Sequence, residues 1–362
     1  MGMFDKIFGK RSSSKLEKEA EPSPEIVIED SLNSEFISGT FRGSRVMFQS
    51  VESPNGEWHC LYASSRSDDG APIVLVNSSG QVAHAFSVTR VEDAAVANNG
   101  TIVVTDIGDA TDQDLGGTLV IVDSNGELIV EHGFDANIWR CAITDNGRYA
   151  STATHNPDRT VYIFDVDTGG IVTEYETANL NSPPQKFENY DGEEVLYLLD
   201  GDSRSRAINF DGETVWRSEE LVRKDRYEEL RASGKEANLE EALELLEEAY
   251  ELADSENEKK PVARELGETH WKLAKEIWKE EGDTDEWWAN LNQAKMYYME
   301  ILPWHDGKKG VAKVQRKQAK YHLKKGNENI ALELLQNIAT MEDEYDVQLL
   351  TDHDKKTITD LS

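Results

Sequence analysis

The sequence predicts a chain in two parts: an all-β region of four repeated units, followed by an all-α region of helical hairpins. Three observations support this prediction. Turn pairs containing Gly recur at a nearly constant spacing through the middle of the chain. Between the turns lie short runs rich in β-branched and aromatic residues, which favour strands. After Ser218 the apolar residues change to the i, i+3, i+4, i+7 spacing of an amphipathic helix.

Two interleaved series of turn pairs mark the β repeats. The first series is Asn55-Gly56, Asn99-Gly100, Asn146-Gly147 and Asp191-Gly192, with spacings of 44, 47 and 45 residues. The second series is Ser79-Gly80, Asn125-Gly126, Thr168-Gly169 and Asp211-Gly212, with spacings of 46, 43 and 43 residues. Asn-Gly and Asp-Gly close hairpins because these residues tolerate positive φ. Two series with one shared period indicate four repeats.

Each repeat contains four strand-like runs. In the third repeat these are residues 138–143, 148–154, 160–165 and 171–176. Four strands in a period near 45 residues are typical of propeller blades. The segments TLVIVDSNGELIV, TVYIFDVDTGGIV and RAINFDGETVW resemble the third strands of WD40 and quinoprotein-type propellers. We therefore expect a four-unit β-propeller-like domain over residues 36–218. Its ring closes with four blades, borrows residues 36–49 as an extra strand, or pairs with another chain.

The α region repeats a small residue followed by larger ones at +4 and +3. The three sets are Ala242-Leu246-Ala249, Ala294-Tyr298-Ile301 and Ala331-Leu335-Ile338. Small residues at a helix contact allow a short distance between the axes. Residues 219–345 resemble tetratricopeptide (TPR) repeats, although their units lie 52 and 37 residues apart rather than the 34 of the family. The resemblance implies stacked hairpins that present a binding surface. Residues 1–35 and 346–362 are expected to be tails.

The charge of the chain restricts its partners. Its 70 acidic and 38 basic residues give a formal net charge of −32, a field that repels nucleic acid. Between residues 36 and 218, 28 acids face 11 bases and Lys186 is the only lysine. This usage resembles that of proteins from salt-loving microbes, and an ordinary acidic protein is the alternative. We expect a protein partner and no nucleic acid.

The sequence also bears on compartment and anchoring. Cys60 and Cys141 are too few for a disulfide framework. No apolar run reaches the roughly 18 residues of a membrane helix, and no signal peptide is recognisable, so we expect a cytoplasmic protein. Phe4, Ile7 and Phe8 lie at one-face helical spacing near lysines. They form either a short membrane or partner anchor or a frayed chain end.

The sequence contains little that indicates catalysis. The motifs G-x-S-x-G, G-x-G-x-x-G and the P-loop are missing, so we predict neither an enzyme nor a cofactor. Asp106, Asp109, Asp112 and Asp114 crowd one of the longer loops. They are weak candidates for a cation site, with a solvated acidic loop as the alternative. His155, Asp158 and Arg159 share another long loop. An enzyme, or a ligand or cation sensor, on this loop face is the alternative function.

A basic segment near residues 308–325 is exceptional in so acidic a chain. The basic residues that share one helical face are Lys313, Arg316, Lys317, Lys320 and Lys324. They predict a strip that binds an acidic segment of a partner protein. The alternative is neutralisation within the chain by the acids of the first hairpin, which are Glu240, Glu244, Glu247, Glu248 and Glu251.

Two tryptophans add a second candidate surface. Trp271 and Trp278 follow one helical stripe, which predicts either a helix core or an aromatic-lined peptide groove. Repeat architectures of both kinds present large surfaces and need no cofactor. We therefore expect a non-catalytic adaptor or scaffold that holds protein partners.

Overall fold

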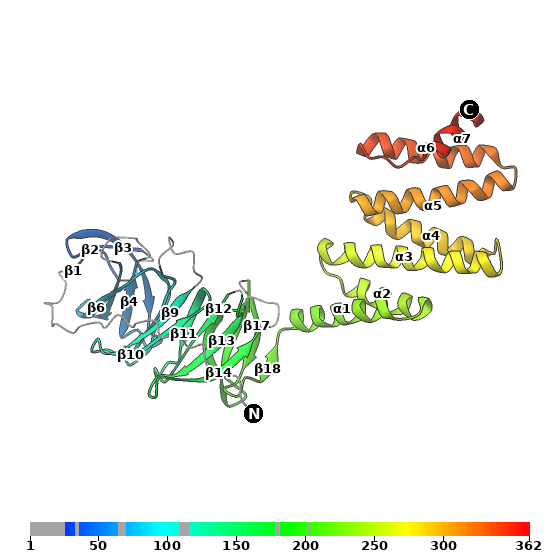
Figure 1. The fold of residues 1–362 in the computed structure, drawn as a ribbon. Helices are drawn as coiled ribbons and strands as arrows, with labels where there is room; N and C mark the ends of the chain where they lie inside the picture. Colours follow the sequence, from blue (N-terminus) through cyan, green and yellow to red (C-terminus); the bar gives the residue numbers. More distant parts are fainter. Residues whose placement is uncertain are drawn as a thin grey trace, which may run out of the picture. The chain divides into compact units, whose positions relative to one another are not determined.

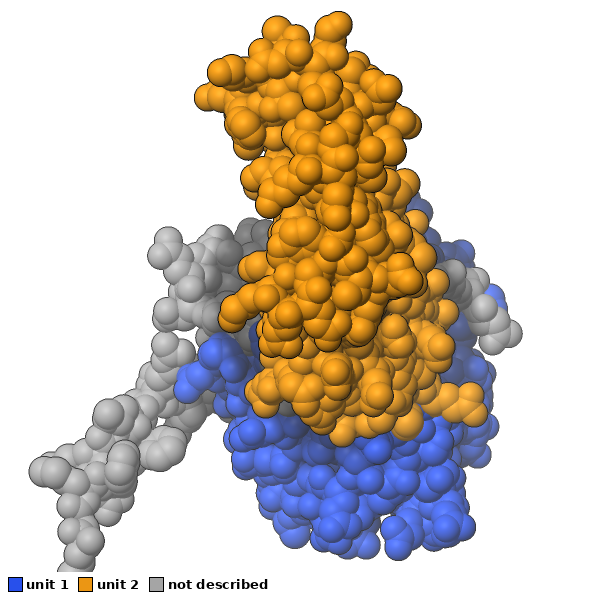
Figure 2. Space-filling model, turned by 90° about the vertical axis from the view of Figure 1, so that its right-hand side faces the viewer, with its two compact units in different colours: residues 1–218 blue, residues 219–362 orange. Residues whose placement is uncertain are grey.

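The computed structural model describes residues 26–32, 36–63, 70–108, 116–155, 157–177, 182–201 and 203–362. The chain divides into two compact units, residues 1–218 and residues 219–362. They are coloured separately in Figure 2 and are called the β unit and the α unit below.

The β unit contains four antiparallel sheets that follow one another along the chain (Figure 1). The first sheet consists of β1 (Ile26–Ile28), β2 (Phe36–Phe41), β3 (Ser44–Glu52), β4 (Trp58–Tyr62), β5 (Ala71–Asn77) and β6 (Val82–Val88). The second consists of β7 (Val91–Val96), β8 (Ile102–Asp106), β9 (Gly117–Val122) and β10 (Leu128–Phe134). The third consists of β11 (Ile138–Ile143), β12 (Tyr149–Thr154), β13 (Thr160–Asp165) and β14 (Gly170–Glu176). The fourth consists of β15 (Pro184–Tyr190), β16 (Glu193–Asp200), β17 (Ser203–Ile208) and β18 (Thr214–Arg217).

In every sheet, strands that are neighbours in the sequence are hydrogen-bonded neighbours in space. The predicted turn pairs produce this meander. Gly147, for example, has φ of +78° and Gly126 has φ of +83°, a backbone conformation that favours glycine. The predicted β-propeller-like architecture of four units is confirmed.

Neighbouring sheets are joined by apolar clusters. Ile73 of β5 packs with Val104 of β8 between the first and second sheets. Val103 and Phe164 share the next cluster, and Ile163 and Leu198 share the one between the third and fourth sheets. Each sheet therefore buries one face against the next, as repeats in a stacked array do.

The outer faces of the first and fourth sheets belong to two separate apolar clusters. In the first sheet, Ile37 of β2 and Phe48 of β3 pack with Leu61 and Val74 of β4 and β5. Residues 36–49 therefore supply extra strands to the first sheet, and their side chains pack with those of β4 and β5 on its outer face. β1 pairs with β2, with Ile28 opposite Gly39, so the expectation that residues 1–35 form only a tail and linker is wrong.

The outer face of the fourth sheet is covered in a different way. Arg204 donates from Nη1 and Nη2 to the two carboxylate oxygens of Glu188, each at 2.8 Å. Its guanidinium carbon also lies 4.4 Å from the centre of the Tyr197 ring. A polar pair over an aromatic ring closes this end of the array, because the planar guanidinium both stacks and hydrogen-bonds.

The α unit consists of three helical hairpins and a final helix, stacked in order (Figure 1). The helices are α1 (Glu219–Glu236), α2 (Leu239–Leu252), α3 (Glu256–Glu280), α4 (Asp285–Glu300), α5 (His305–Lys324), α6 (Glu328–Tyr345) and α7 (Asp352–Leu361). The repeated residues lie on α2, α4 and α6, the second helix of each hairpin, except Ile301, which caps the C-terminus of α4. All nine are buried, and Ala249, Ala294 and Ile338 have no exposed area. The predicted TPR-like hairpins are confirmed.

The C-terminal residues are part of the α unit, so the prediction of a tail over residues 346–362 is wrong. α7 begins with a capping box in which Thr351 and Asp354 exchange hydrogen bonds with each other's backbone N–H groups. Asp354 also accepts a hydrogen bond from Arg316 of α5, at 2.7 Å. The acidic and polar composition of α7 concealed this helix, because a long-range ion pair and a cap fix it rather than an apolar stripe.

Candidate functional site

The basic residues of α5 lie over tryptophans of α3. The Lys313 amine is 4.5 Å from the centre of the Trp271 ring, and the Lys317 amine is 4.7 Å from that of Trp278. Such a distance is within the range of a cation–π contact. Lys320 and Lys324 follow on the same helix and are exposed. We call the surface formed by Trp271, Trp278, Lys313, Lys317, Lys320 and Lys324 the lysine face.

The tryptophans connect this surface to the core. Trp278 packs on Trp287, with ring centres 4.6 Å apart, and Trp287 has no exposed area. Ala274, between Trp271 and Trp278 in the sequence, is also fully buried. The two predictions for the tryptophan stripe therefore describe two sides of one structure. Each ring packs against the hairpin core, and a lysine amine lies over its face.

The four lysines of the lysine face form no ion pairs with described residues. Burial lowers the pKa of Lys313 and of Lys317 below the usual 10.5. At Lys313 the carboxylate of Glu268 on α3 raises the pKa again in part, and the charges of Lys275 and Lys272 lower it. At Lys317 the charges of Lys324, Lys320 and Lys275 lower it further. Sequence reasoning missed Lys272 and Lys275, although they lie between the two tryptophans.

The acids of the first hairpin do not neutralise this surface. Glu248 pairs with Arg226, at 2.9 Å. Glu240, Glu244, Glu247 and Glu251 have no ion pair with any residue that the structure describes. The lysine face is therefore a positive surface on a very acidic chain, and the acids of the first hairpin form no ion pair with it.

Arg316 does not belong to the lysine face. Its Nε donates to Asp354 of α7, and its Nη2 donates to the backbone oxygen of Leu349, each at 2.7 Å. The Asp354 side chain is only 4% exposed. We therefore correct the prediction that Arg316 binds a partner: it holds α7. By spacing alone, Arg316 and Lys317 share one helical face. In the structure, Arg316 contacts α7 and Lys317 contacts Trp278 of α3.

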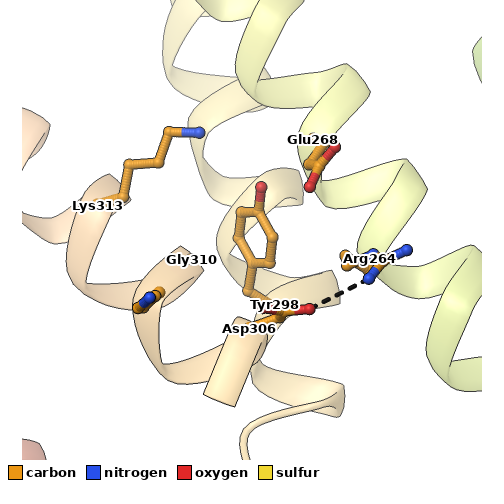
Figure 3. A pocket seen from close by; sticks show the side chains of 7 residues that line it. Arg264, Glu268, Tyr298, Asp306, Gly310 and Lys313 are labelled. Atoms are coloured by element: carbon orange, nitrogen blue, oxygen red, sulfur yellow. Dashed lines mark hydrogen bonds and ion pairs between the residues drawn. The ribbon is translucent and has the colours of Figure 1, made fainter. Parts of the chain in front are cut away.

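A hollow of about 400 Å³ adjoins Lys313 between α3 and α5 (Figure 3). It exists because Gly310 lets α5 approach Tyr298, whose ring would clash with any Cβ at that position. In Figure 3, Lys313 lies on one side of Tyr298, and Arg264 and Glu268 lie on the other. Arg264 pairs with Asp306, at 3.2 Å. The hollow thus combines cations with two carboxylates and extends the lysine face without strong net charge.

The candidate residues of the β unit have structural roles where they are described. Asp106 accepts hydrogen bonds from the backbone N–H groups of Thr89, Arg90 and Gly108, at 2.8–3.0 Å. Asp109, Asp112 and Asp114 lie outside the described residues. No group of three His, Cys, Asp or Glu side chains among the described residues is arranged to hold a metal ion.

The His155 loop is likewise a built turn. The Asp158 carboxylate accepts hydrogen bonds from the hydroxyl groups of Thr154, Thr160 and Tyr162, at 2.9, 3.1 and 2.6 Å. His155 stacks on Trp139, with ring centres 4.5 Å apart. A carboxylate that accepts three hydrogen bonds is fixed in place.

The N-terminal anchor cannot be placed, since Phe4, Ile7 and Phe8 lie outside the described residues. Among the helices that the structure does describe, none is long and apolar enough to span a bilayer.

No family model and no curated protein matches this chain. Among solved structures, it is similar to the β-propeller domain of Cps50 (Swd1) from Myceliophteria thermophila, with 12% sequence identity and a TM-score of 0.29. The similarity covers 46% of this chain and 64% of that one, so the chain spans somewhat less than two thirds of the length of that domain. The assignment of the fold rests on the four sheets and three hairpins themselves.

Proposed function

We propose that this protein is a non-catalytic adaptor whose α unit holds an acidic segment of a protein partner on the lysine face. One observation supports the proposal above all others. Lys313 and Lys317 are partly buried against tryptophan rings, and neither forms an ion pair with a described residue; the nearest acidic influence is that of Glu268 on Lys313. A partner carboxylate supplies the missing counter-charge and restores the pKa of both amines towards the usual value.

The tryptophans add an apolar contribution to binding that salt does not screen. An exposed ion pair contributes only about 0–1 kcal/mol and is screened over about 8 Å at physiological ionic strength. An acidic segment on the lysine face also contacts the partly buried rings of Trp271 and Trp278, and apolar contact persists when salt weakens the charges. Duplex nucleic acid carries similar charge, but its length exposes it to the acidic remainder of the protein.

The experiment uses the full chain and a short, fluorescent peptide of alternating Glu and Ala. Lys317→Glu with Lys320→Glu should weaken peptide binding by about tenfold or more, as expected when exposed pairs become repulsive. Lys259→Glu with Lys356→Glu is the matched control, because both lysines are exposed on other surfaces of the α unit and the change in net charge is the same. The control should bind almost as the wild type does.

The pH dependence of binding provides a second measurement. The protonated amine binds the carboxylate, so affinity is greatest below the lysine pKa and decreases as the pH rises through it. Because the pKa of Lys313 and Lys317 is lowered, affinity should start to decrease at a lower pH than the usual 10.5 implies. Equal binding by both double variants, or preferential binding of duplex DNA over the peptide, contradicts the proposed function.

A further inference from the structure

An acidic stripe on α2 matches the lysine face in spacing. Glu240, Glu244, Glu247 and Glu251 follow one another at +4, +3 and +4. Lys313, Lys317, Lys320 and Lys324 do the same. Both sets lie along one side of a helix. The first and last members are eleven positions apart, a length of about 16 Å at 1.5 Å per residue. The pattern is the same in both directions, so the two stripes match in parallel or antiparallel orientation.

Each stripe lacks partners of opposite charge. All four glutamates are exposed, and none has an ion pair with a described residue. The four lysines likewise have no ion pair with a described residue. Within one α unit, α2 belongs to the first hairpin and α5 to the third. In a single copy, the acidic stripe and the lysine face are therefore both available to bind another molecule.

Apolar surface lies close to the acidic stripe. Tyr250, which is within the span of the stripe on α2, donates a hydrogen bond to Glu300 of α4. Glu300 lines a hollow of about 530 Å³, together with Met296 and Met299, which are 45% and 51% exposed. Exposed methionines adapt readily to aromatic surfaces, and the lysine face presents the edges of two tryptophans.

We propose that the acidic stripe of one copy docks on the lysine face of a second copy. The proposal rests on the proposed function, since it names an occupant of the same lysine face. Each copy can supply one stripe and accept the other: a twofold arrangement pairs both stripes within one dimer, and a head-to-tail arrangement pairs one acidic stripe with one lysine face at each contact. Self-association then occupies the surface that an acidic partner needs, so the partner and the second copy compete.

The test measures the mass of the full chain by sedimentation at about physiological ionic strength, where the repulsion between two chains of net charge −32 is screened beyond about 8 Å. The wild-type chain should form dimers there that dissociate in molar salt, since stronger screening weakens the charge pairs of the stripes as well. The variant Glu244→Lys with Glu247→Lys should weaken dimerisation by about tenfold or more, as should Lys317→Glu with Lys320→Glu. All four positions are at least partly exposed, and circular dichroism confirms that each variant is folded.

Mixing the two variants gives the decisive result. Each alone brings two like charges together at both stripes, whereas the mixed pair brings opposite charges together at both. A mixed dimer should therefore form with wild-type affinity. A wild-type chain that stays monomeric at physiological ionic strength overturns the inference, and so does a mixture that stays monomeric.

The Glu–Ala peptide separates this inference from the proposed function. The variant Glu244→Lys with Glu247→Lys keeps an intact lysine face, so it should bind the peptide at least as tightly as the wild type. If that variant binds the peptide while the wild type is monomeric, only the inference fails. If neither protein binds the peptide, the proposed function fails.

Discussion

The β unit and the α unit join their repeats by different means. Between sheets of the β unit, buried apolar side chains such as Phe164 and Leu198 make the contact. Between the first two hairpins of the α unit, arginines of α1 bridge to α3 in addition to the apolar core. Arg223 pairs with Glu258 at 2.9 Å, and Arg231 pairs with Glu265 at 2.8 Å.

The difference explains where each unit carries its charge. Apolar junctions need no cations, and residues 36–218 of the β unit contain a single lysine and a large excess of acids. The α unit uses its arginines for internal bridges, as Arg316 does with Asp354, and most of its lysines are exposed. The composition of each unit therefore reflects its type of junction, and the lysine face stands out because its cations have no internal use.

The largest expected effect tests whether the two units are independent. Gly310→Val places side-chain atoms against the Tyr298 ring and should destabilise the α unit by about 3 kcal/mol. Gly133→Val is the matched control in the β unit, where a Cβ meets no atom within 4 Å. Hydrogen exchange followed by mass spectrometry reports on each unit separately.

Gly310→Val should raise exchange in residues 219–362 and leave residues 36–218 protected. Gly133→Val should change neither unit by more than about 0.5 kcal/mol, as is usual for a surface substitution. Loss of protection in both units of Gly310→Val would show that they unfold together, and the comparison above would no longer hold.

Local rules predicted most of the fold. The Asn146-Gly147 turn was predictable because positive φ is a property of the residues themselves, and β11 and β13 begin and end where the sequence placed them. The Ala331-Leu335-Ile338 set was predictable because a buried helical stripe repeats with the helix period.

The candidate site was predictable only in part. The lysines and the tryptophans were found as two separate patterns, because only the packing of α5 near α3 places Lys313 over Trp271. Arg316 was assigned to the wrong surface because its partner, Asp354, is 38 residues away on a helix without an apolar stripe. Spacing defines a helical face, and tertiary packing decides which of its members are exposed.

The next effect separates the units by their response to salt. The β unit contains 28 acids and 11 bases over residues 36–218, so repulsion opposes its folding and screening relieves that repulsion. Its melting temperature should rise by about 5 °C or more between low and molar KCl, which is on the order of 1–2 kcal/mol for a unit of this size. The α unit should gain less, because salt also screens its internal arginine bridges. A flat or falling curve for the β unit contradicts the salt-adaptation interpretation.

The smallest effect concerns a carboxylate at a junction between sheets. Asp93 of β7 accepts a hydrogen bond from the backbone N–H of Cys141 in β11, at 3.0 Å. Burial raises the pKa of Asp93, with a further rise from Glu92, while the hydrogen bonds from Cys141 and Ala94 and the charge of Arg140 lower it. The ionised form is therefore unfavourable in the folded protein relative to the unfolded chain.

The sign of this contribution gives a direct test by Asp93→Asn. At neutral pH the folded chain must keep Asp93 ionised, and as the pH falls through the raised pKa the folded protein takes up the proton first. Stability from this group thus increases on acidification. The amide oxygen of the substituted residue still accepts from Cys141, so the variant should be slightly more stable at pH 7, by less than about 1 kcal/mol because the group is partly solvated.

The gain should disappear as the pH falls below the raised pKa, where the wild type is already neutral. Urea unfolding at a series of pH values measures the difference between the two chains. If Asp93→Asn is instead less stable at pH 7 and the loss disappears on acidification, the charge strengthens the hydrogen bond to Cys141 by more than burial penalises it. In that case the β unit, like the α unit, relies on a charged group at one of its junctions, and the contrast between apolar and ionic junctions becomes one of degree.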